Sequence, residues 1–384
     1  MVDYMADILL VTPRFISGGI ENFIINVIKN KKNREINYAL LLYQNEFNNE
    51  YVAELKKYGI KIYCANSDKY KGIVRKIYEP IFFFYFLKNN HFDIVHIHQT
   101  VLRRSIDLFF AKVAGVPVRI IHSHGSKGLK KESLFIKIKR SMLKNLYLYA
   151  ATDFWACSED AAIYLFPPKI IRNNRYTIIK NGIDIGRYAF DLKKRNDIRN
   201  KFGIEENCLL LGTVGRLTYF KNHEFMIQIL KAAKERCDFS VKLLIVGDGE
   251  LKGHLSSITK KEKLENDVIF AGDVTDTNAY LSAMDCFLFT SITEGLGIAA
   301  IEAQCNGLPV FIGANLPKET SITSNTVRLN LKQGADAWCE CIIEKPMKRI
   351  DGAEAIRKTG YDICDVVNGI EMRYLNTLEG LKTK

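Results

Sequence analysis

The feature that most constrains this fold is a regular alternation of short apolar runs with segments of helical periodicity. Most of the apolar runs lack alternating polar residues, which is typical of strands covered on both faces. After the first run, Ile20, Phe23, Ile24, Val27 and Ile28 recur at helical spacing. This alternation predicts an α/β fold with parallel, doubly wound sheets. We expect strands at residues 7–12, 36–43, 60–64, 93–98, 116–122, 153–157, 176–180, 209–214, 241–246, 267–271, 286–290, 308–312 and 327–330.

The alternation restarts near the middle of the chain. An Asn-Gly-Ile-Asp sequence at residues 181–184 precedes a charged stretch at 191–199, and a new strand begins at Leu209. Because the charged stretch shows no strand pattern, we place a linker near residues 184–205. Two separate sheets are therefore favoured over one large sheet.

The chain has 384 residues, which is enough for two domains that each bury a core. We expect two Rossmann-like domains that face a central cleft, residues 1–185 and residues 186–360. A terminal helix, within residues 361–384, is expected to complete the first domain.

The composition excludes several classes of protein. Hydrophobic residues make up 47% of the chain, which is too many for a disordered protein. The apolar run Ile81–Leu87 is far shorter than the roughly 20 residues that a membrane-spanning helix needs. The N-terminus lacks a basic region before its first apolar run, so we expect no signal peptide. Nine cysteines without a CxxC pair are typical of a reducing cytoplasm.

Positive charge is concentrated in the first half of the chain. The formal net charge is +12, but residues 1–200 carry 33 basic and 18 acidic side chains, whereas residues 201–384 carry 22 and 25. Within the first half, residues 51–150 hold 19 basic and 6 acidic side chains. An excess of this size indicates that the first domain meets an anionic partner.

Two glycines follow the first expected strand. Gly18 and Gly19 precede the helix that begins near Ile20. Glycines at such a position let a ligand approach the backbone, and the helix N-terminus offers unpaired N–H groups to an anion. A plain tight turn is the alternative. Neither a GxGxxG sequence nor a GxxxxGK[ST] loop occurs in the chain, which argues against dinucleotide and P-loop sites.

A pair of cations follows the first strand of the second half. Arg216 comes directly after Gly215, and Lys221 lies five residues further on, before a predicted helix. Parallel sheets bind ligands beyond the carboxyl ends of their strands, where these cations are expected. Arg can hold a phosphate through two hydrogen bonds, and Lys supplies a mobile charge. Two solvated loop cations are the alternative.

The most informative segment runs from Thr293 to Glu302. Glu294 ends a loop, Gly295 and Gly297 expose backbone, and Glu302 lies in an otherwise apolar helix. If both carboxylates were helical, eight positions would separate them by about 12 Å. A glycosidase pair lies about 5–9.5 Å apart, so this spacing instead suits the two ends of an elongated polyol ligand.

These motifs together resemble the retaining glycosyltransferases of family 4 with the GT-B fold, over nearly the whole chain. Finer features resemble the family's bacterial capsule, exopolysaccharide and O-antigen branch. The family motifs are Gly18-Gly19, Arg216-x4-Lys221, Glu294-x7-Glu302 and Asn181-Gly182-Ile183-Asp184. The finer features are Arg119-Ile120-Ile121-His122-Ser123-His124 and Glu302-Ala303-Gln304. One departure is that the Gly-Gly-x-x-Glu of many relatives is replaced here by Gly313-Ala314-Asn315-Leu316-Pro317-Lys318-Glu319.

The resemblance implies a donor site in the second domain. Arg216 and Lys221 would hold the donor diphosphate and stabilise charge as the nucleotide leaves. Glu294 would bind hydroxyls of the donor sugar, and Glu302 would bind the ribose. Further donor contacts are implied for Gly18, Gly19, Gly272, Val274, Gly295, Leu296 and Gly297.

The resemblance also implies a histidine near the reacting sugar carbon. His122 and His124 compete for this role, and we favour His122. His96 and His98 end the preceding strand. Because residues two apart on a strand share a face, a metal site is a second interpretation. We disfavour it because no carboxylate or Cys accompanies the histidines, so we expect no metal and no other cofactor.

A basic segment with interleaved apolar residues predicts contact with an anionic membrane surface. Membrane or acceptor contacts are expected for Arg75, Lys76, Lys130, Lys131, Lys137 and Arg140. The alternative is a solvated helix face beside a buried aromatic helix. Nucleic acid is disfavoured, since the sequence shows no helix-turn-helix, RRM or zinc-finger pattern.

The sequence therefore predicts a metal-independent retaining glycosyltransferase for surface polysaccharide. We expect it to transfer a hexose or N-acetylhexosamine from a nucleotide sugar, with UDP favoured, to a polyprenyl-diphosphate-linked acceptor. We expect it in the cytoplasm at the inner face of the membrane. The alternatives are a GT-B relic that binds membrane or nucleic acid without turnover, and a GT-B sugar-nucleotide epimerase.

Overall fold

The chain divides into two compact units in a computed structural model. The structure describes residues 5–16, 18–100, 104–125, 134–345 and 348–382, but not the side chains of 134–137, 139 and 382. Unit 1 comprises residues 1–182 and 363–384, and unit 2 comprises residues 183–362.

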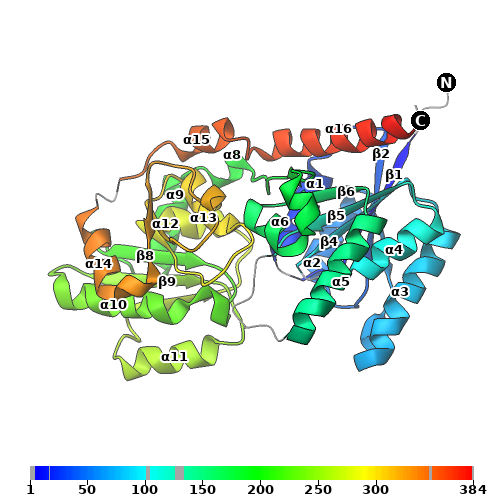
Figure 1. Ribbon diagram of the computed structural model, residues 1–384. Helices are drawn as coiled ribbons and strands as arrows, with labels where there is room; N and C mark the ends of the chain where they lie inside the picture. The colour runs from blue at the N-terminus through cyan, green and yellow to red at the C-terminus, as the bar shows by residue number, and fades with distance from the viewer. Residues whose placement is uncertain (1–4, 17, 101–103, 126–133, 346–347, 383–384) are drawn as a thin grey trace. The chain divides into compact units, whose positions relative to one another are not determined.

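Unit 1 contains a seven-stranded parallel sheet in the order β3-β2-β1-β4-β5-β6-β7 (Figure 1). The chain forms its strands where the apolar runs predict them, because both faces of the sheet are covered by helices. The strands are β1 (Ala6–Thr12), β2 (Ile36–Leu42), β3 (Lys61–Cys64), β4 (Ile94–Gln99), β5 (Val118–Ser123), β6 (Asp153–Ala156) and β7 (Thr177–Ile178).

The helices of unit 1 form two groups. Helices α1, α2 and α16 contribute to one core with the sheet, and α3, α4 and α5 pack side by side (Figure 1). Their bounds are α1 (Gly19–Lys29), α2 (Asn49–Lys57), α3 (Gly72–Asn89), α4 (Ser105–Ala114), α5 (Leu134–Ala150), α6 (Glu159–Leu165), α7 (Pro168–Arg172) and α16 (Ile363–Lys382). Among the described helices, none is long and apolar enough to cross a membrane.

Unit 2 contains a six-stranded parallel sheet in the order β10-β9-β8-β11-β12-β13. Its strands are β8 (Leu209–Val214), β9 (Val241–Val246), β10 (Val268–Gly272), β11 (Cys286–Phe289), β12 (Val310–Gly313) and β13 (Thr326–Leu329). Its helices are α8 (Ile185–Tyr188), α9 (Leu192–Lys201), α10 (His223–Arg236), α11 (Lys252–Lys261), α12 (Thr277–Ala283), α13 (Ile298–Cys305), α14 (Gly334–Glu344) and α15 (Gly352–Lys358). The expected α/β class with two Rossmann-like sheets is thus confirmed, and each expected strand is present.

The charged stretch that we expected to be a linker is instead part of unit 2. It forms α9, and Arg195 and Arg199 both bind the carboxylate of Asp285, at 2.7 and 3.2 Å. Arg199 also donates to the carbonyl oxygens of Ala283 and Cys208. The linker interpretation was wrong because these charges face partners at the end of α12 and the start of β11, not solvent.

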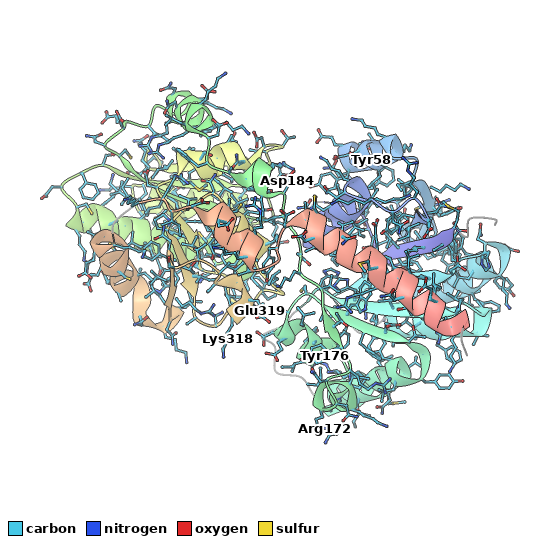
Figure 2. All side chains as sticks on the ribbon, turned by 90° about the horizontal axis from the view of Figure 1, so that it is seen from above. Tyr58, Arg172, Tyr176, Asp184, Lys318 and Glu319 are labelled. Carbon is cyan, nitrogen blue, oxygen red and sulfur yellow. The ribbon has the colours of Figure 1, made fainter. Side chains whose placement is uncertain are left out.

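The terminal helix α16 belongs to unit 1, along which it runs in Figure 2. Its apolar residues recur at helical spacing and join the core beneath it, at Ile363, Val367, Ile370, Tyr374 and Leu378. A β-carbon on Gly182 would stand 2.8 Å from the backbone of Ile363, so the chain crossing there requires glycine. Also on α16, Glu371 accepts hydrogen bonds from the backbone N–H groups of Lys32 and Asn33, which follow α1.

We predict that Ile370→Ala lowers the free energy of unfolding of unit 1 by about 2–4 kcal/mol, because it leaves a cavity in the core under α16. Ile370 is 1% exposed. The chain has two tryptophans, Trp155 in unit 1 and Trp338 in unit 2. Urea titration of Trp155 fluorescence in a Trp338→Phe background therefore reports on unit 1.

The matched control is Met372→Ala on the same helix, where the side chain is 54% exposed. This change is expected to alter the unfolding free energy by less than about 0.5 kcal/mol. Equal losses in the two variants would show that α16 does not complete the core of unit 1.

Candidate functional site

The strand order places the predicted site residues at corresponding points of the two sheets. In each sheet the first strand lies beside the fourth, so that the chain crosses to opposite sides of the sheet at this point. Ligands of open parallel sheets bind beyond the carboxyl ends of such strand pairs. Gly18 and Gly19 follow β1, and His98 lies near the end of β4. In unit 2, Arg216 follows β8 and Glu294 follows β11.

A close ion pair joins the loops after β8 and β11. Lys221 Nζ lies 2.6 Å from Glu294 Oε1, and the two side chains are 25% and 14% exposed. Thr290 Oγ1 donates to the carbonyl oxygen of Asn222, and Asn222 Nδ2 donates to the carbonyl oxygen of Thr290, so side-chain-to-backbone hydrogen bonds also join the two loops. The structure thus brings together two residues that the sequence assigns to one donor site.

The two cations after β8 differ in their surroundings. The Lys221 stem passes beside Gly215, where a β-carbon would lie 3.5 Å from Lys221 Cε. Arg216 is exposed, and among the contacts of the described residues none involves its guanidinium. An exposed guanidinium beside a paired lysine is available to a ligand phosphate, which Arg binds through two parallel hydrogen bonds.

The conformation of the loop before α13 requires glycine. Gly297 has φ +87°, and a β-carbon there would stand 2.7 Å from the ring of Phe289. Leu296 is buried, and its carbonyl oxygen accepts a hydrogen bond from Thr320. Helix α13 begins only at Ile298, so Glu294 is not helical and the helical spacing considered from the sequence does not apply. The N-terminal N–H groups of α13 follow directly after this loop.

Glu302 lies on α13 in an environment that disfavours its charge. Burial raises the pKa of the Glu302 carboxyl to about 7, although a hydrogen bond with Tyr188 and the charge of Arg187 oppose the shift. Both partners belong to α8, which the sequence analysis did not connect with this site. A carboxyl with this pKa changes charge near neutral pH.

The remaining predicted donor residues of unit 2 follow β10. Gly272 has φ +73°, at an irregularity in the pairing of β10 with β9. Its carbonyl oxygen accepts a hydrogen bond from the N–H of Gly247 at 2.8 Å. Val274 is partly buried two residues later. Gly272 and Val274 therefore lie at the carboxyl end of β10, and their contact with a donor stays a prediction.

In unit 1 the glycine loop leads into α1. A β-carbon on Gly18 would stand 2.6 Å from Glu21 Oε2, whereas no atom lies within 4 Å of a β-carbon on Gly19. A side chain at Gly18 would therefore require only the flexible Glu21 carboxylate to move, and among the described residues the space beside Gly19 is open. Glu21 places a carboxylate in the first turn of α1, which the sequence analysis did not consider for this anion site.

Four histidines from β4 and β5 form one cluster in unit 1. His96 Nε2 lies 3.2 Å from His122 Nδ1, and His98 Nδ1 lies 3.0 Å from His124 Nε2. Phe23 of α1 contacts the rings of His98, His122 and His124 at 5.1–5.5 Å between centroids. The structure thus connects the helix after Gly19 with the predicted histidine site.

The cluster is neutral at physiological pH. Burial lowers the pKa of all four imidazoles below the ordinary value, to about 3 for His124. His122 is fully buried, whereas His124 is partly exposed. The nitrogens of these two rings that have no partner among the described residues, His122 Nε2 and His124 Nδ1, are both buried, and a neutral ring does not supply positive charge.

Three members of the cluster, His96, His98 and His122, place ring nitrogens within 4.8 Å of one another. The rings of His96 and His122 are 11° from parallel, with centroids 5.3 Å and nitrogens 3.2 Å apart. The distance between the centroids exceeds the distance between the nitrogens by roughly one ring diameter, so the two nitrogens point at each other. Metal ligands instead converge on an ion about 2.0–2.1 Å from each nitrogen. The geometry of this pair is that of a hydrogen bond.

The structure describes some, but not all, of the cations that were predicted to contact a membrane or an acceptor. Arg75 Nε pairs with the buried Glu79 at 3.1 Å and its side chain is 31% exposed, so its contact with a membrane or acceptor stays a prediction. Lys76 is exposed, and Arg140 lies over the ring of Tyr164 at 5.1 Å. Lys130 and Lys131 lie outside the described residues, as does the side chain of Lys137.

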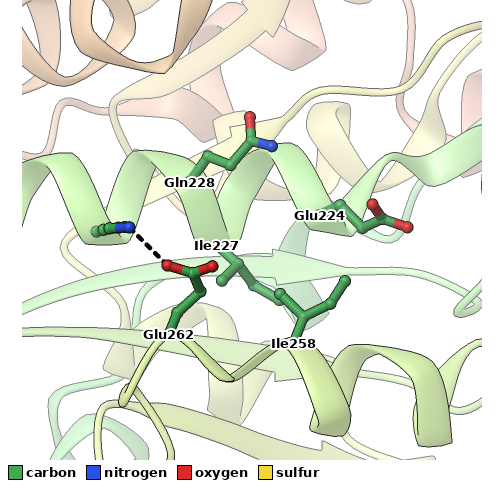
Figure 3. A pocket seen from close by; sticks show the side chains of 6 residues that line it. Glu224, Ile227, Gln228, Ile258 and Glu262 are labelled. Atoms are coloured by element: carbon green, nitrogen blue, oxygen red, sulfur yellow. Dashed lines mark hydrogen bonds and ion pairs between the residues drawn. The ribbon is translucent and has the colours of Figure 1, made fainter. Parts of the chain in front are cut away.

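A surface hollow of about 290 Å³ lies between α10 and α11 (Figure 3). Its rim carries the ion pair between Lys231 and Glu262, at 2.5 Å. The other lining residues are Glu224, Ile227, Gln228 and Ile258. No predicted site residue lines this hollow, and its charges are paired across the two helices.

Residues 194–343 match the model of the family Glycosyl transferases group 1. A Bacillus subtilis protein named as a glycosyltransferase, EpsF, is 28% identical over 90% of both chains. The UDP-Gal:alpha-D-GlcNAc-diphosphoundecaprenol alpha-1,3-galactosyltransferase of Escherichia coli is 29% identical over 63% of this chain and 62% of that protein. The capsular polysaccharide biosynthesis glycosyltransferase CapH of Staphylococcus aureus is 26% identical, over 83% and 84%.

The fold also matches solved structures. Anabaena HepE in complex with UDP and glucose superimposes with a TM-score of 0.77 at 18% identity, over 97% of this chain and 100% of that one. The likeness establishes the fold as two Rossmann-like units of the GT-B type. The family match covers the cation and glutamate motifs of unit 2 and confirms a group 1 glycosyl transferase domain there.

We predict that Glu302→Gln stabilises unit 2 more at pH 8 than at pH 5. When folding raises the pKa of a carboxyl, the folded state holds the proton more tightly than the unfolded state does. The folded protein then loses stability as pH rises from the unfolded pKa of about 4.5 through the folded pKa of about 7. The gain from Gln is expected to be about 1–3 kcal/mol larger at pH 8. Urea unfolding followed by Trp338 fluorescence in a Trp155→Phe background measures it.

The control is Glu265→Gln, which changes an exposed glutamate of the same unit. Its effect on unfolding is expected to be the same at both pH values. A pH-independent effect of Glu302→Gln would show that the Glu302 carboxylate is not disfavoured in the folded protein.

Proposed function

Because residues 194–343 form a group 1 glycosyl transferase domain, we propose that this protein is a retaining, metal-independent glycosyltransferase of surface polysaccharide synthesis. The observation that carries the proposal is the Lys221–Glu294 pair beside Arg216, at the point of the unit 2 sheet where ligands bind. It combines phosphate-binding cations with a carboxylate that accepts hydrogen bonds from sugar hydroxyls.

The proposed donor is a UDP-sugar that carries a hexose or an N-acetylhexosamine. The name of the Escherichia coli relative specifies UDP-Gal, and the Anabaena structure contains UDP and glucose. In this chain, Arg216 and Lys221 hold the diphosphate, Glu294 binds sugar hydroxyls and Glu302 binds the ribose. The N–H groups of Leu296 and Gly297 assist at the start of α13. The two cations supply positive charge at the leaving group, which is the role a metal ion would otherwise serve.

The proposed reaction retains the configuration of the sugar. The bond between the anomeric carbon and the phosphate oxygen breaks, and the acceptor oxygen bonds to the same face of that carbon. The acceptor hydroxyl gives its proton to the leaving β-phosphate oxygen. Lys221 and Arg216 stabilise the charge that develops on the diphosphate, so their effect is larger in the transition state than in the ground state.

The proposed acceptor is a sugar linked to a polyprenyl diphosphate. The Escherichia coli relative is named for a GlcNAc-diphosphoundecaprenol acceptor. Such a lipid places the reaction at the cytoplasmic face of the membrane, and the excess positive charge of residues 51–150 favours attraction to anionic lipid.

Helix α3 supplies a surface suited to this membrane contact. Ile73, Ile77, Ile81 and Tyr85 recur every four residues, and each is between 45% and 71% exposed. Lys71, Lys76 and Lys88 of the same segment are also exposed. Helix α5, which packs against α4, exposes Ile138 and Met142. Exposed apolar residues flanked by lysines are typical of helices that lie in a membrane interface. The buried aromatic helix considered from the sequence applies only to the inner residues, such as Phe83.

The proposal is tested with a panel of UDP- and GDP-sugars in the presence of a metal chelator. We expect slow hydrolysis of one donor and transfer to a lipid-diphosphate acceptor. A change in the configuration of the intact donor would indicate an epimerase. No hydrolysis and no thermal shift with any nucleotide would indicate a binding protein without turnover, and either result would overturn the proposal.

We predict that Lys221→Ala and Glu294→Ala each lower the rate of transfer at least about 100-fold, because each removes a group that contacts the diphosphate or the sugar in the transition state. Initial rates at saturating donor measure the effect. Lys231→Ala is the matched control, since it breaks a Lys–Glu pair of similar length in the same unit and is expected to leave the rate unchanged. Near-normal turnover in either site variant, with the fold intact, would rule out the assignment.

We predict that replacing Ile77, Ile81 and Tyr85 together by Ser reduces binding to anionic phospholipid vesicles at least about tenfold, because these side chains lose apolar contact with the bilayer. Vesicle sedimentation measures binding, and donor hydrolysis should not change. Phe239→Ser, at a residue of unit 2 that is 47% exposed, is the control. Equal binding by the triple variant and the parent would show that α3 does not contact the membrane.

A further inference from the structure

The histidine cluster is connected to the terminal helix by a hydroxyl. Tyr374 of α16 lies 2.6 Å from His96 Nδ1, and His96 Nε2 lies 3.2 Å from His122 Nδ1. The three groups thus form a continuous hydrogen-bonded chain from α16 through β4 to β5. Tyr374 and His96 are 1% exposed and His122 is 0% exposed, so solvent does not compete for these bonds.

A neutral imidazole has one N–H donor and one bare nitrogen, so one proton position determines the others along the chain. If Tyr374 donates to His96 Nδ1, His96 must carry its proton on Nε2 and donate to His122 Nδ1. His122 then carries its own proton on Nε2. In the opposite arrangement His122 Nε2 is bare, and the proton of the Tyr374 hydroxyl needs another acceptor.

Two observations select the first arrangement. The distance of 2.6 Å is in the range of O–H donors and shorter than usual for an N–H donor. Burial also raises the pKa of Tyr374 well above its ordinary value, so the hydroxyl keeps its proton. Among the contacts of the described residues, His96 is the one hydrogen-bond partner of this hydroxyl.

The position of the unpaired group supports the same arrangement. Trp155 stacks on Tyr374 at 5.4 Å, and Tyr38 packs edge-on at 6.4 Å, so an unpaired Tyr374 proton would be enclosed in the core. Such a buried unpaired donor costs about 1–3 kcal/mol. In the first arrangement the unpaired donor is His122 Nε2, which is also buried and has no hydrogen-bond partner among the described residues, but His122 lies near the carboxyl end of β5, where a ligand oxygen can pair with it. Ligands of parallel sheets bind at that edge.

We propose that Tyr374 and His96 are positioning residues that fix His122 as the Nε2–H tautomer, so that His122 donates a hydrogen bond from Nε2 to an oxygen of the substrate. The consequence for turnover rests on the proposed function and on the donor-sugar contact that the family resemblance implies for His122. His122 in this form has no lone pair on Nε2, so it binds a hydroxyl or carbonyl oxygen and does not act there as a general base. The tautomer itself does not depend on the reaction.

The test is a long-range proton–nitrogen NMR spectrum of the full chain with ¹⁵N-labelled histidine. The chain has seven histidines, and loss of one spin system in His122→Gln assigns His122. We expect a protonated Nε2 and a bare Nδ1 in the parent protein. In Tyr374→Phe we expect a mixture of tautomers at His122, and a fall in kcat of about three- to tenfold with little change in the donor KM, as for the loss of one net hydrogen bond.

Tyr38→Phe is the matched control. It removes a buried hydroxyl that has no hydrogen-bond partner and whose ring packs against Tyr374. The tautomer and kcat should remain those of the parent. Thermal unfolding of both variants verifies that the fold is kept, and the spectrum of the parent tests the proposal even if Tyr374→Phe fails to fold.

Three results would overturn the proposal. They are a proton on His122 Nδ1 in the parent protein, an unchanged tautomer in Tyr374→Phe, and a stoichiometric metal whose removal shifts the His96 and His122 nitrogens. A changed tautomer with unchanged turnover supports the positioning chain and refutes the sugar contact assigned to His122. Failure of transfer with every donor, with the expected tautomer present, refutes the proposed function alone.

Discussion

The order of strands in the two parallel sheets is the constraint on which the rest of the structure depends. In each sheet the fourth strand lies beside the first, so loops that are far apart in sequence meet at one edge. In unit 2 this adjacency lets Lys221, which follows β8, reach Glu294, which follows β11, at 2.6 Å. In unit 1 the same adjacency places the helix after Gly19 against the histidines of β4 and β5.

The two units handle charge in different ways. Unit 2 presents cations and carboxylates at its strand ends, which suits a ligand with phosphates and hydroxyls. Unit 1 presents neutral imidazoles at the corresponding edge, because burial lowers the pKa of each ring. The basic excess of the first half therefore does not arise from the site at this edge. We attribute it to the outer surface, where exposed lysines flank the apolar residues of α3.

The sequence predicted the parts of the molecule that depend on local pattern. Strands such as β8 and β9 have the predicted bounds because an unbroken apolar run is sufficient to identify a strand covered on both faces. The motif around Glu294 and the cations of the β8 loop were also identified from the sequence. They lie together because loops that follow the first and fourth strands meet at one edge. The roles assigned to these residues remain predictions.

Other features could not be predicted because they arise from contacts between distant residues. The raised pKa of Glu302 depends on burial against Tyr188 of α8, and the link between His96 and Tyr374 spans 278 positions. The stretch that forms α9 was interpreted as a linker because sequence does not reveal that Arg195 and Arg199 share Asp285.

A crystal structure with a bound UDP-sugar analogue is the most direct test of the central claim, which is that unit 2 binds the donor beyond β8 and β11. We predict that the diphosphate oxygens lie within hydrogen-bonding distance of Arg216 and Lys221, that the sugar hydroxyls contact Glu294, and that the ribose contacts Glu302. A nucleotide bound elsewhere, such as in the hollow between α10 and α11, with the Lys221–Glu294 pair free of ligand, would contradict the account.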